Sequence, residues 1–345
     1  MKIARLVHSP GIGETLATAL DADGAPMALH CDLVSDQDRP RLGDVRQARL
    51  RTQAADQGGA FLEDVVTGGP LFLAGAPPPG ISEGAALTVA VVAEARSDKA
   101  ARVRLAREGE ATAATPLARW QAALPAPGPD LPLETGPEAD ALCQLALGRA
   151  LDPEPTLPGG GRIRLARTPA LTAIDIDTAG RRDRGRASAR AHALNTVAVA
   201  EAARSLALAQ LGGLIVIDCV GPVRAPDRPA LKQAFRAALR AVTTRRADVL
   251  APSPLGLIEA ALAWGETPLW DRRTGAAASL ADGLAALERA ARAEPGASLR
   301  LHLPEAAHAL YLDRAAVYRS GLKARYGGRL DVVAGQGATP EVART

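Results

Sequence analysis

Cysteine, aromatic residues and long apolar runs are all scarce in this chain of 345 residues. The three cysteines, Cys31, Cys143 and Cys219, are an odd number and lie far apart, which argues against a disulfide framework and against a paired metal-ligand motif. No apolar run approaches the roughly 18 residues that span a bilayer. The N-terminus "MKIARLVHSP" lacks the apolar stretch of a signal peptide. We therefore expect a cytoplasmic protein with no membrane partner.

Histidine and lysine are also rare, which limits the possible catalytic, metal-binding and nucleic-acid-binding sites. The five histidines show neither metal-ligand spacing nor a partner nucleophile, so triad chemistry has no support. The net charge of +3 comes almost entirely from arginine and is too mild to indicate a nucleic-acid partner by itself. The hydrophobic content of 47% is enough for two or three modest domains.

The first third of the chain reads as short strands. Residues 1–35 contain three extended segments separated by turns. Residues 37–106 contain five more, with Gly and Pro turns between them, which fits a small barrel of the OB type. Residues 111–137 are rich in Pro and Ala and have little periodicity, so we expect a linker or a partly ordered connection.

The stretch from 170 to about 260 predicts a β-α-β unit. A strand at 171–177 precedes an arginine-rich loop and an alanine-rich helix, and the strand "LIVID" follows paired glycines. Because Leu214 to Ile217 is apolar at every position, we expect this strand to be covered on both faces. If the two strands are parallel neighbours, Asp175 and Asp218 emerge at the same sheet edge, where open α/β sheets place ligands.

Two carboxylates converging at such an edge suit Mg²⁺, which keeps several waters and leaves room for a substrate phosphate. One such ion can polarise a phosphodiester and activate water. The alternative is that each aspartate caps a helix or forms a turn.

Basic and aromatic residues suggest a nucleic-acid partner. The loop arginines Arg181, Arg182, Arg184 and Arg186 could hold a nucleic-acid backbone, or could pair within the loop with Asp177 and Asp183. Two of the three phenylalanines, Phe61 and Phe72, fall on predicted barrel strands, where exposed rings would stack on bases and buried rings would only fill the core.

Three sequence blocks resemble a known family. They are "LPGGGRIRLARTPALTAIDIDTAG", "AEAARSLALAQLGGLIVIDCVGP" and "SPLGLIEAA", and together they resemble the catalytic core of the ribonuclease E/G family. The resemblance implies an α/β multi-domain fold. Its parts would be an RNase H-like subdomain (1–36 and 107–170), an inserted OB-type RNA-binding β-barrel (37–106), a DNase I-like catalytic subdomain (171–269), a linker (270–278), a small C-terminal α/β domain (279–335) and a tail (336–345).

The resemblance also assigns roles to residues. The family's two Mg²⁺-binding aspartates fall on Asp175 and Asp218, and Asp177 stands where the family has an asparagine, in a position to orient water or phosphate. Phe61 and Phe72 match barrel aromatics that contact RNA, and Lys99 matches a basic residue there.

Three departures from the family pattern have consequences. The region of the family's 5′-monophosphate sensor is largely replaced by the Pro-rich stretch near 111–137. The zinc-binding cysteine pair corresponds to "WDRRTG" at 270–275, so we expect neither zinc nor a zinc-linked tetramer. Pro254 and Leu255 replace an Arg-Phe pair, which removes a basic contact.

The resemblance implies a Mg²⁺-dependent endoribonuclease that cleaves single-stranded RNA during RNA processing or decay and leaves 5′-phosphate and 3′-hydroxyl ends. The alternative is an RNA-binding protein of the same fold that has lost efficient cleavage. By the same likeness, the C-terminal domain suggests a possible homo-oligomer.

Overall fold

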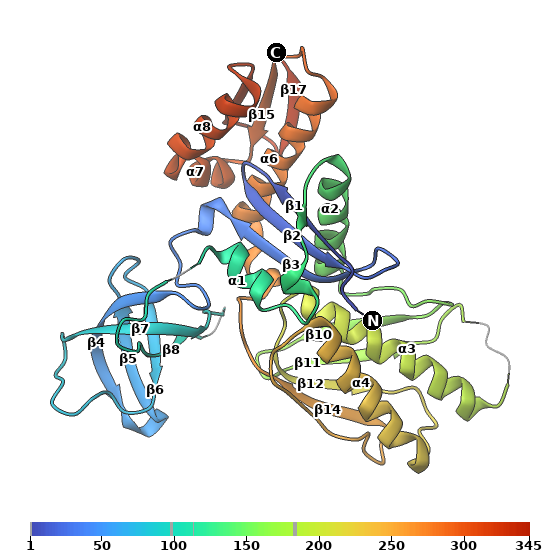
Figure 1. Cartoon of the computed structure of the whole chain (residues 1–345). Helices are drawn as coiled ribbons and strands as arrows, with labels where there is room; N and C mark the ends of the chain where they lie inside the picture. Colours follow the sequence, from blue (N-terminus) through green and yellow to red (C-terminus); the bar gives the residue numbers. More distant parts are fainter. Residues whose placement is uncertain (1, 97–98, 113, 182–184) are drawn as a thin grey trace.

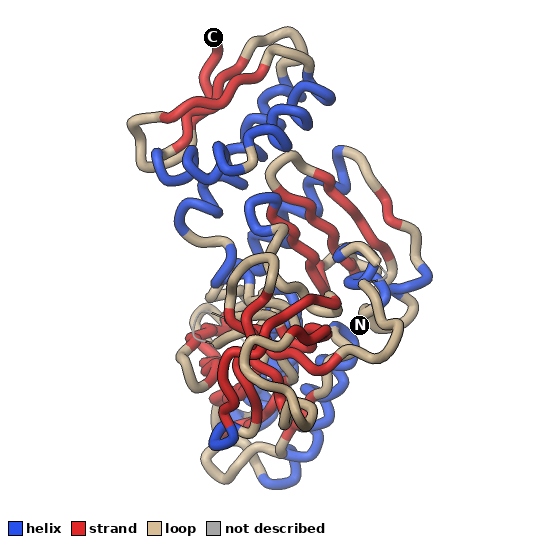
Figure 2. The backbone as a smooth tube through the Cα atoms, turned by 90° about the vertical axis from the view of Figure 1, so that its left-hand side faces the viewer, coloured by secondary structure: helices blue, strands red, loops and turns tan. Residues whose placement is uncertain are grey.

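The computed structural model describes residues 2–345 except 97–98, 113 and 182–184. The described residues form three sheets with their helices and one closed barrel (Figure 1). In Figure 1 the barrel lies to one side of the body, and the C-terminal elements lie at the top, beyond the N-terminal sheet. Figure 2, turned by 90°, brings the barrel to the front.

The N-terminal sheet has the order β3-β2-β1-β9. Its elements and the adjoining helices are β1 (Arg5–Pro10), β2 (Glu14–Leu20), β3 (Pro26–Leu33), β9 (Leu133–Glu134), α1 (Pro116–Ala122) and α2 (Pro137–Leu151). Its two faces contribute to two different cores, one with α2 and one with α3 (Ala187–Leu208), which explains why β2 and β3 are buried almost throughout.

The stretch 111–137 contains more structure than the sequence suggested. β9 pairs in parallel with β1, and α1 begins after Thr115, whose side chain accepts a hydrogen bond from the Ala118 amide. A threonine cap followed by Pro116 is a helix start signal. Of the two expectations for this stretch, the structure favours the partly ordered connection over a linker without elements.

The five strands expected in residues 37–106 close into a barrel in the order β4-β5-β6-β8-β7. They are β4 (Val45–Ala54), β5 (Gly59–Asp64), β6 (Pro70–Ala74), β7 (Ala86–Ala93) and β8 (Ala101–Leu105). Alternate residues point inward and fill the interior, including Leu50, Leu62, Leu71, Val89 and Val103. The barrel fits an OB-type domain within a multi-domain α/β protein.

The third unit is a five-stranded sheet in the order β10-β11-β12-β14-β13. Its elements are β10 (Arg162–Arg167), β11 (Leu171–Asp177), β12 (Gly213–Asp218), β13 (Ala247–Val249), β14 (Leu257–Leu262) and α4 (Arg228–Val242). β10 pairs antiparallel with β11, so the predicted boundary at residue 170 cuts through a hairpin and was wrong.

Helices cover one face of this sheet and leave the strands' other face more open. Ile174, Ile176, Ile215 and Ile217 share a core with α3 and α4. On the opposite face the Leu214 side chain is 58% exposed, so the expectation that this strand is covered on both faces was wrong. The apolar run "LIVI" alone could not distinguish a covered face from an open one.

The C-terminal unit comprises a three-stranded sheet, β16-β15-β17, and its helices. The elements are α5 (Leu269–Arg272), α6 (Gly275–Ala293), β15 (Leu299–Leu303), α7 (Glu305–Asp313), α8 (Ala315–Tyr326), β16 (Leu330–Ala334) and β17 (Glu341–Arg344). The predicted linker 270–278 instead holds most of α5 and the start of α6, where alanines favour helix. The predicted tail contains β17, which pairs antiparallel with β15.

The sequence predicted neither a membrane-spanning segment nor a disulfide framework. In the described part of the chain, no helix combines the length and apolar character needed to cross a membrane. All three cysteines are free and buried.

Candidate active site

Asp175 and Asp218 are neighbours across a parallel strand pair. The register of β11 and β12 places Leu171 beside Leu214 and Asp175 beside Asp218. Adjacent strands lie about 4.8 Å apart, and residues in register point to the same face. Both aspartates are exposed, while the isoleucines that precede them are buried beneath the helices. The strand alternation thus directs two carboxylates to the open face at the carboxyl edge of the sheet.

No described side chain hydrogen-bonds to or forms an ion pair with either carboxylate. Among the described residues, Asp175 and Asp218 make no hydrogen bond or ion pair, unlike most acidic residues nearby. No group of three or more His, Cys, Asp or Glu side chains within the described ranges is arranged to hold a metal. A pair of exposed, unpaired carboxylates nevertheless fits Mg²⁺, which needs only one or two protein carboxylates when water and phosphate complete its shell.

Asp177 has a different environment. Its Oδ1 accepts a hydrogen bond from the Ala179 amide at 2.8 Å, and its Oδ2 lies 3.2 Å from Arg164 Nη2 and 3.6 Å from Arg162 Nε. Its carboxylate is therefore committed to a turn and to two guanidinium groups of β10. The structure brings Asp177 to the site, but as a partner of arginines.

Two of the four predicted loop arginines, Arg181 and Arg186, are among the described residues. Arg181 Nη1 donates to the carbonyl oxygens of Pro158 and Gly160 at 3.0 and 3.1 Å, so this side chain braces the glycine turn before β10. Arg186 is exposed at the start of α3. Arg182 and Arg184 lie outside the described residues. A cavity of about 280 Å³, lined by Thr178, Arg181, Arg190 and Gly221 among others, opens just beyond the ends of β11 and β12.

The β13–β14 loop approaches the aspartate pair from the other side. Leu257 is the register partner of Asp218, and the loop before it carries Pro254 and Leu255. The Leu255 side chain is 84% exposed. This loop brings an apolar residue to the site.

Cys219, directly after Asp218, is buried and is a poor candidate for a nucleophile. Burial, together with the charge of Asp218, raises the pKa of the Cys219 thiol to about 12. The thiol therefore stays protonated at neutral pH, and thiolate chemistry is disfavoured.

Phe61 and Phe72 lie on the outside of the barrel. They are register partners on β5 and β6, with ring centroids 5.3 Å apart in an edge-to-face arrangement. Both rings are partly exposed, whereas Leu62 and Leu71 fill the barrel interior. The alternative that both phenylalanines are core residues of the barrel was wrong.

Arg96 and Lys99, between β7 and β8, lie beside the five-stranded sheet. Lys99 is exposed and, with Arg96, lines a cavity of about 560 Å³ whose other walls include Leu171, Leu214 and Trp264. Four residues along a strand span about 13 Å. The Leu171–Leu214 pair is four residues before the Asp175–Asp218 pair, so the cavity and the aspartates lie toward opposite ends of one open face.

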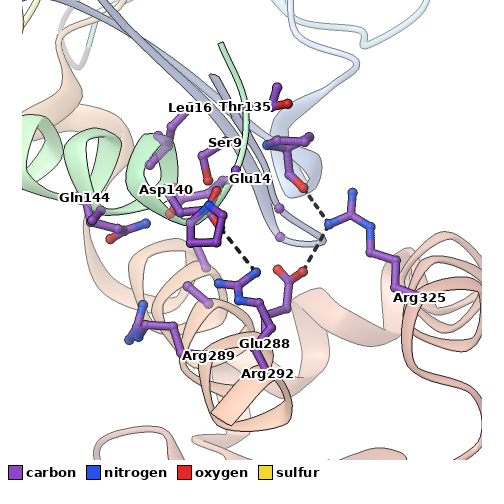
Figure 3. A pocket seen from close by; sticks show the side chains of 18 residues that line it. Ser9, Glu14, Leu16, Thr135, Asp140, Gln144, Glu288, Arg289, Arg292 and Arg325 are labelled. Carbon is purple, nitrogen blue, oxygen red and sulfur yellow. Dashed lines mark hydrogen bonds and ion pairs between the residues drawn. The ribbon is translucent and has the colours of Figure 1, made fainter. Parts of the chain in front are cut away.

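A second large cavity lies away from the aspartates. It measures about 610 Å³ and lies between the β1–β2 hairpin, α2, α6 and α8 (Figure 3). Two ion pairs lie among its lining residues, Arg325 with Glu288 at 3.1 Å and Arg292 with Asp140 at 3.5 Å. No residue of the five-stranded sheet lines it.

Sequence reasoning missed three residues that the structure places around the open face. The Arg96 guanidinium lies 4.1 Å from the Trp264 ring centroid, and Arg164 is the register partner of Asp175. The alternation of arginine and apolar residues in "RIRLAR" was the available signal for Arg164, since it puts Arg162 and Arg164 on one face. Trp264 carried no local signal, because its partners come from distant segments.

Comparison with known proteins identifies the segment that holds the aspartates. The model of the ribonuclease E/G family matches residues 141–261, which include Asp175, Asp177 and Asp218. Ribonuclease E of Escherichia coli (strain K12) is 38% identical over 110 residues, which cover 32% of this chain and 10% of that protein. Ribonuclease E of Nostoc sp. (strain PCC 7120) is 37% identical over 116 residues, covering 33% and 16%.

Ribonuclease E of Haemophilus influenzae is 36% identical over 110 residues, covering 32% of this chain and 12% of that protein. The matched segment therefore spans only a small part of these relatives. The barrel with Phe61, Phe72 and Lys99 lies outside the family match. The match does take in β10 to β14 and the paired aspartates at their edge. Residues 141–261 are therefore similar to the ribonuclease E/G family.

Proposed function

We propose that this protein is a cytoplasmic endoribonuclease that hydrolyses single-stranded RNA with the help of Mg²⁺, leaving 5′-phosphate and 3′-hydroxyl ends. The observation that carries the proposal is the register of Asp175 with Asp218 at the open sheet edge, inside the family segment. The RNase H-like and DNase I-like assignments of the two large α/β units belong to the same proposal.

Asp175 and Asp218 would hold the ion between them. When bound, Mg²⁺ supplies charge for the phosphate and lowers the pKa of a water for in-line attack. The aspartates themselves fix where the scissile phosphate sits, because both project from the ends of rigid, paired strands.

The barrel and the open face would hold the RNA strand. Phe61 and Phe72 offer partly exposed rings for base stacking, and Lys99 with the loop arginines offers positive charge for the backbone. The open face of β11 and β12 runs from Leu171 and Leu214, which line the Lys99 cavity, to the aspartates at its other end.

The test is cleavage of a 5′-labelled single-stranded RNA with Mg²⁺ and with EDTA, followed by analysis of the product ends. We expect Mg²⁺-dependent internal cuts that leave a 5′-phosphate on the downstream fragment. Products with 2′,3′-cyclic ends, or cutting that persists in EDTA, would contradict the proposal.

A second candidate function rests on Asp177. Its charge is committed to Arg162 and Arg164, and Pro254 and Leu255 stand on the other side of the aspartate pair. These features favour an RNA-binding protein with attenuated cleavage. Tight binding of the same RNA without product in Mg²⁺ would establish that alternative.

A further inference from the structure

Arg164 stands beside the aspartate pair on the open face of the sheet. The register of β10 with β11 makes Arg164 the direct partner of Asp175, and the register of β11 with β12 continues the row to Asp218. Directly opposed residues of an antiparallel pair have Cβ atoms about 5 Å apart on one face. Arg164 therefore lies in the same row of the sheet as the two aspartates, directly beside Asp175 and one strand further from Asp218.

The contacts of Arg164 orient its side chain and leave part of it available. Its Nη2 lies 3.2 Å from Asp177 Oδ2, and its Nε lies 3.4 Å from Glu154 Oε1. Among the described residues, no hydrogen bond or ion pair uses its Nη1, and the side chain is 48% exposed. A guanidinium has five N–H donors in a planar fork, so two contacts do not exhaust it.

The charges around Asp175, Asp218 and Arg164 favour a bound phosphate that meets a cation on the aspartate side and the guanidinium on the other. Asp175 and Asp218 are unpaired acids suited to a cation, and an anionic phosphate bound to that cation needs a donor of its own. Arg164 is held at that position from one side by Asp177 and Glu154. From the other side, the β13–β14 loop offers Pro254 and Leu255.

We propose that Arg164 is a substrate-contacting residue that binds a non-bridging oxygen of the RNA phosphate at the Asp175–Asp218 pair. Asp177 acts as a positioning residue that aims Arg164. This inference rests on the proposed ribonuclease function, and it assigns to Asp177 an indirect role through the arginine.

Arg162 provides a matched control. It lies two residues before Arg164 on the same strand and face, and it also contacts Glu154 and Asp177, at 3.3 and 3.6 Å. Its register partner is Asp177, so it lies one row beyond the aspartate pair. Arg246, paired with Asp248 elsewhere on this sheet, controls for loss of a surface charge.

The experiment compares Arg164→Gln, Arg164→Lys, Arg162→Gln and Arg246→Gln by RNA binding in EDTA at several salt concentrations and by cleavage in Mg²⁺. Loss of one charge-assisted phosphate contact should weaken binding and kcat/KM roughly 10- to 100-fold in Arg164→Gln. The dependence of log Kd on log salt should fall by about 0.7, the value for one single-strand phosphate contact. Arg164→Lys keeps the positive charge and should therefore recover part of the lost affinity and part of the lost salt dependence.

The controls make the outcomes decisive. We expect Arg162→Gln and Arg246→Gln to stay within about 3-fold of the wild type, because exposed ion pairs contribute little. An unchanged salt slope and unchanged cleavage in Arg164→Gln would overturn the proposal. If, in that case, Asp218→Asn still abolished cleavage, the ribonuclease function would stand and only the proposed role of Arg164 would fail. If the wild-type protein bound no RNA, both proposals would fail.

Discussion

Asp175 and Asp218 occupy the same register position on two parallel strands, and both side chains are exposed and unpaired among the described residues. Exposed carboxylates without partners contribute little to folding, so their replacement tests function with little effect on stability. We expect Asp175→Asn and Asp218→Asn to change the free energy of unfolding by no more than about 0.5 kcal/mol. Chemical denaturation measures this, and a loss of several kcal/mol would show a structural role.

The outer barrel phenylalanines should contribute to RNA affinity. Stacking on an aromatic ring contributes about 1–3 kcal/mol per base, so Phe61→Ala or Phe72→Ala should weaken RNA binding about 5- to 100-fold. Because the two rings are in contact, the double variant should lose less than the sum. Val66→Ala, an exposed apolar residue of the same barrel, is the control. Equal affinities for all variants would exclude this face from RNA binding.

Gly213 permits a close contact that shapes the cavity near Lys99. It has a φ of +87°, and a Cβ atom there would lie 2.7 Å from Trp264 Cζ2. Arg96 lies over the same tryptophan ring, which restricts where the ring can move. Gly213→Ala should therefore cost about 1–3 kcal/mol of stability.

Gly148 is the matched control for Gly213. It lies in α2 with open space where a Cβ would be, so Gly148→Ala should stabilise the protein by up to about 1 kcal/mol. Thermal unfolding of the two variants should shift in opposite directions. An unchanged unfolding temperature for Gly213→Ala would show that the Trp264 ring can move to make room for the added methyl group.

Glu266 should make stability depend on pH. Burial, followed by the nearby charge of Glu94, raises the pKa of Glu266 to about 7. A carboxyl whose pKa is raised on folding binds more protons in the folded state, so its contribution to stability falls as pH rises from about 4.5 to about 7. In Glu266→Gln, the side-chain amide oxygen can still accept the hydrogen bond that Gln210 donates to the Glu266 carboxyl.

The variant Glu266→Gln lacks this titrating carboxyl, so its free energy of unfolding should not fall with pH for that reason. The difference in stability, variant minus wild type, should therefore rise by about 1–3 kcal/mol between pH 5 and pH 8. The difference between the two proteins must be used, because buried His30, with its pKa lowered to about 4, opposes the trend at acid pH. A constant difference between variant and wild type from pH 5 to 8 would contradict this account.

The sequence predicted the aspartate pair because its signals are local. An apolar strand that ends in aspartate, paired glycines that stop a helix and a second such strand are enough to imply parallel neighbours, and the register confirmed this for Asp175 and Asp218. The five barrel strands were likewise visible from turns and alternation.

What sequence reasoning missed depends on contacts between distant segments. Period-two alternation does not say which sheet a strand joins, so it could not show that β10 pairs with β11 or that β17 pairs with β15. The exposed Leu214 looked buried because hydrophobicity alone does not show whether a helix covers a face. Arg164 was overlooked because its relation to Asp175 exists only through the β10–β11 register.

The most direct test of the central claim is the rate of RNA cleavage in Mg²⁺ by wild type, Asp175→Asn, Asp218→Asn and Asp248→Asn. Asp248 is an exposed aspartate of the same sheet, paired with Arg246 and away from the site. We predict a loss of roughly 100-fold or more for the first two variants and a change within about 2-fold for the third. Cleavage by Asp218→Asn at the wild-type rate would contradict the account.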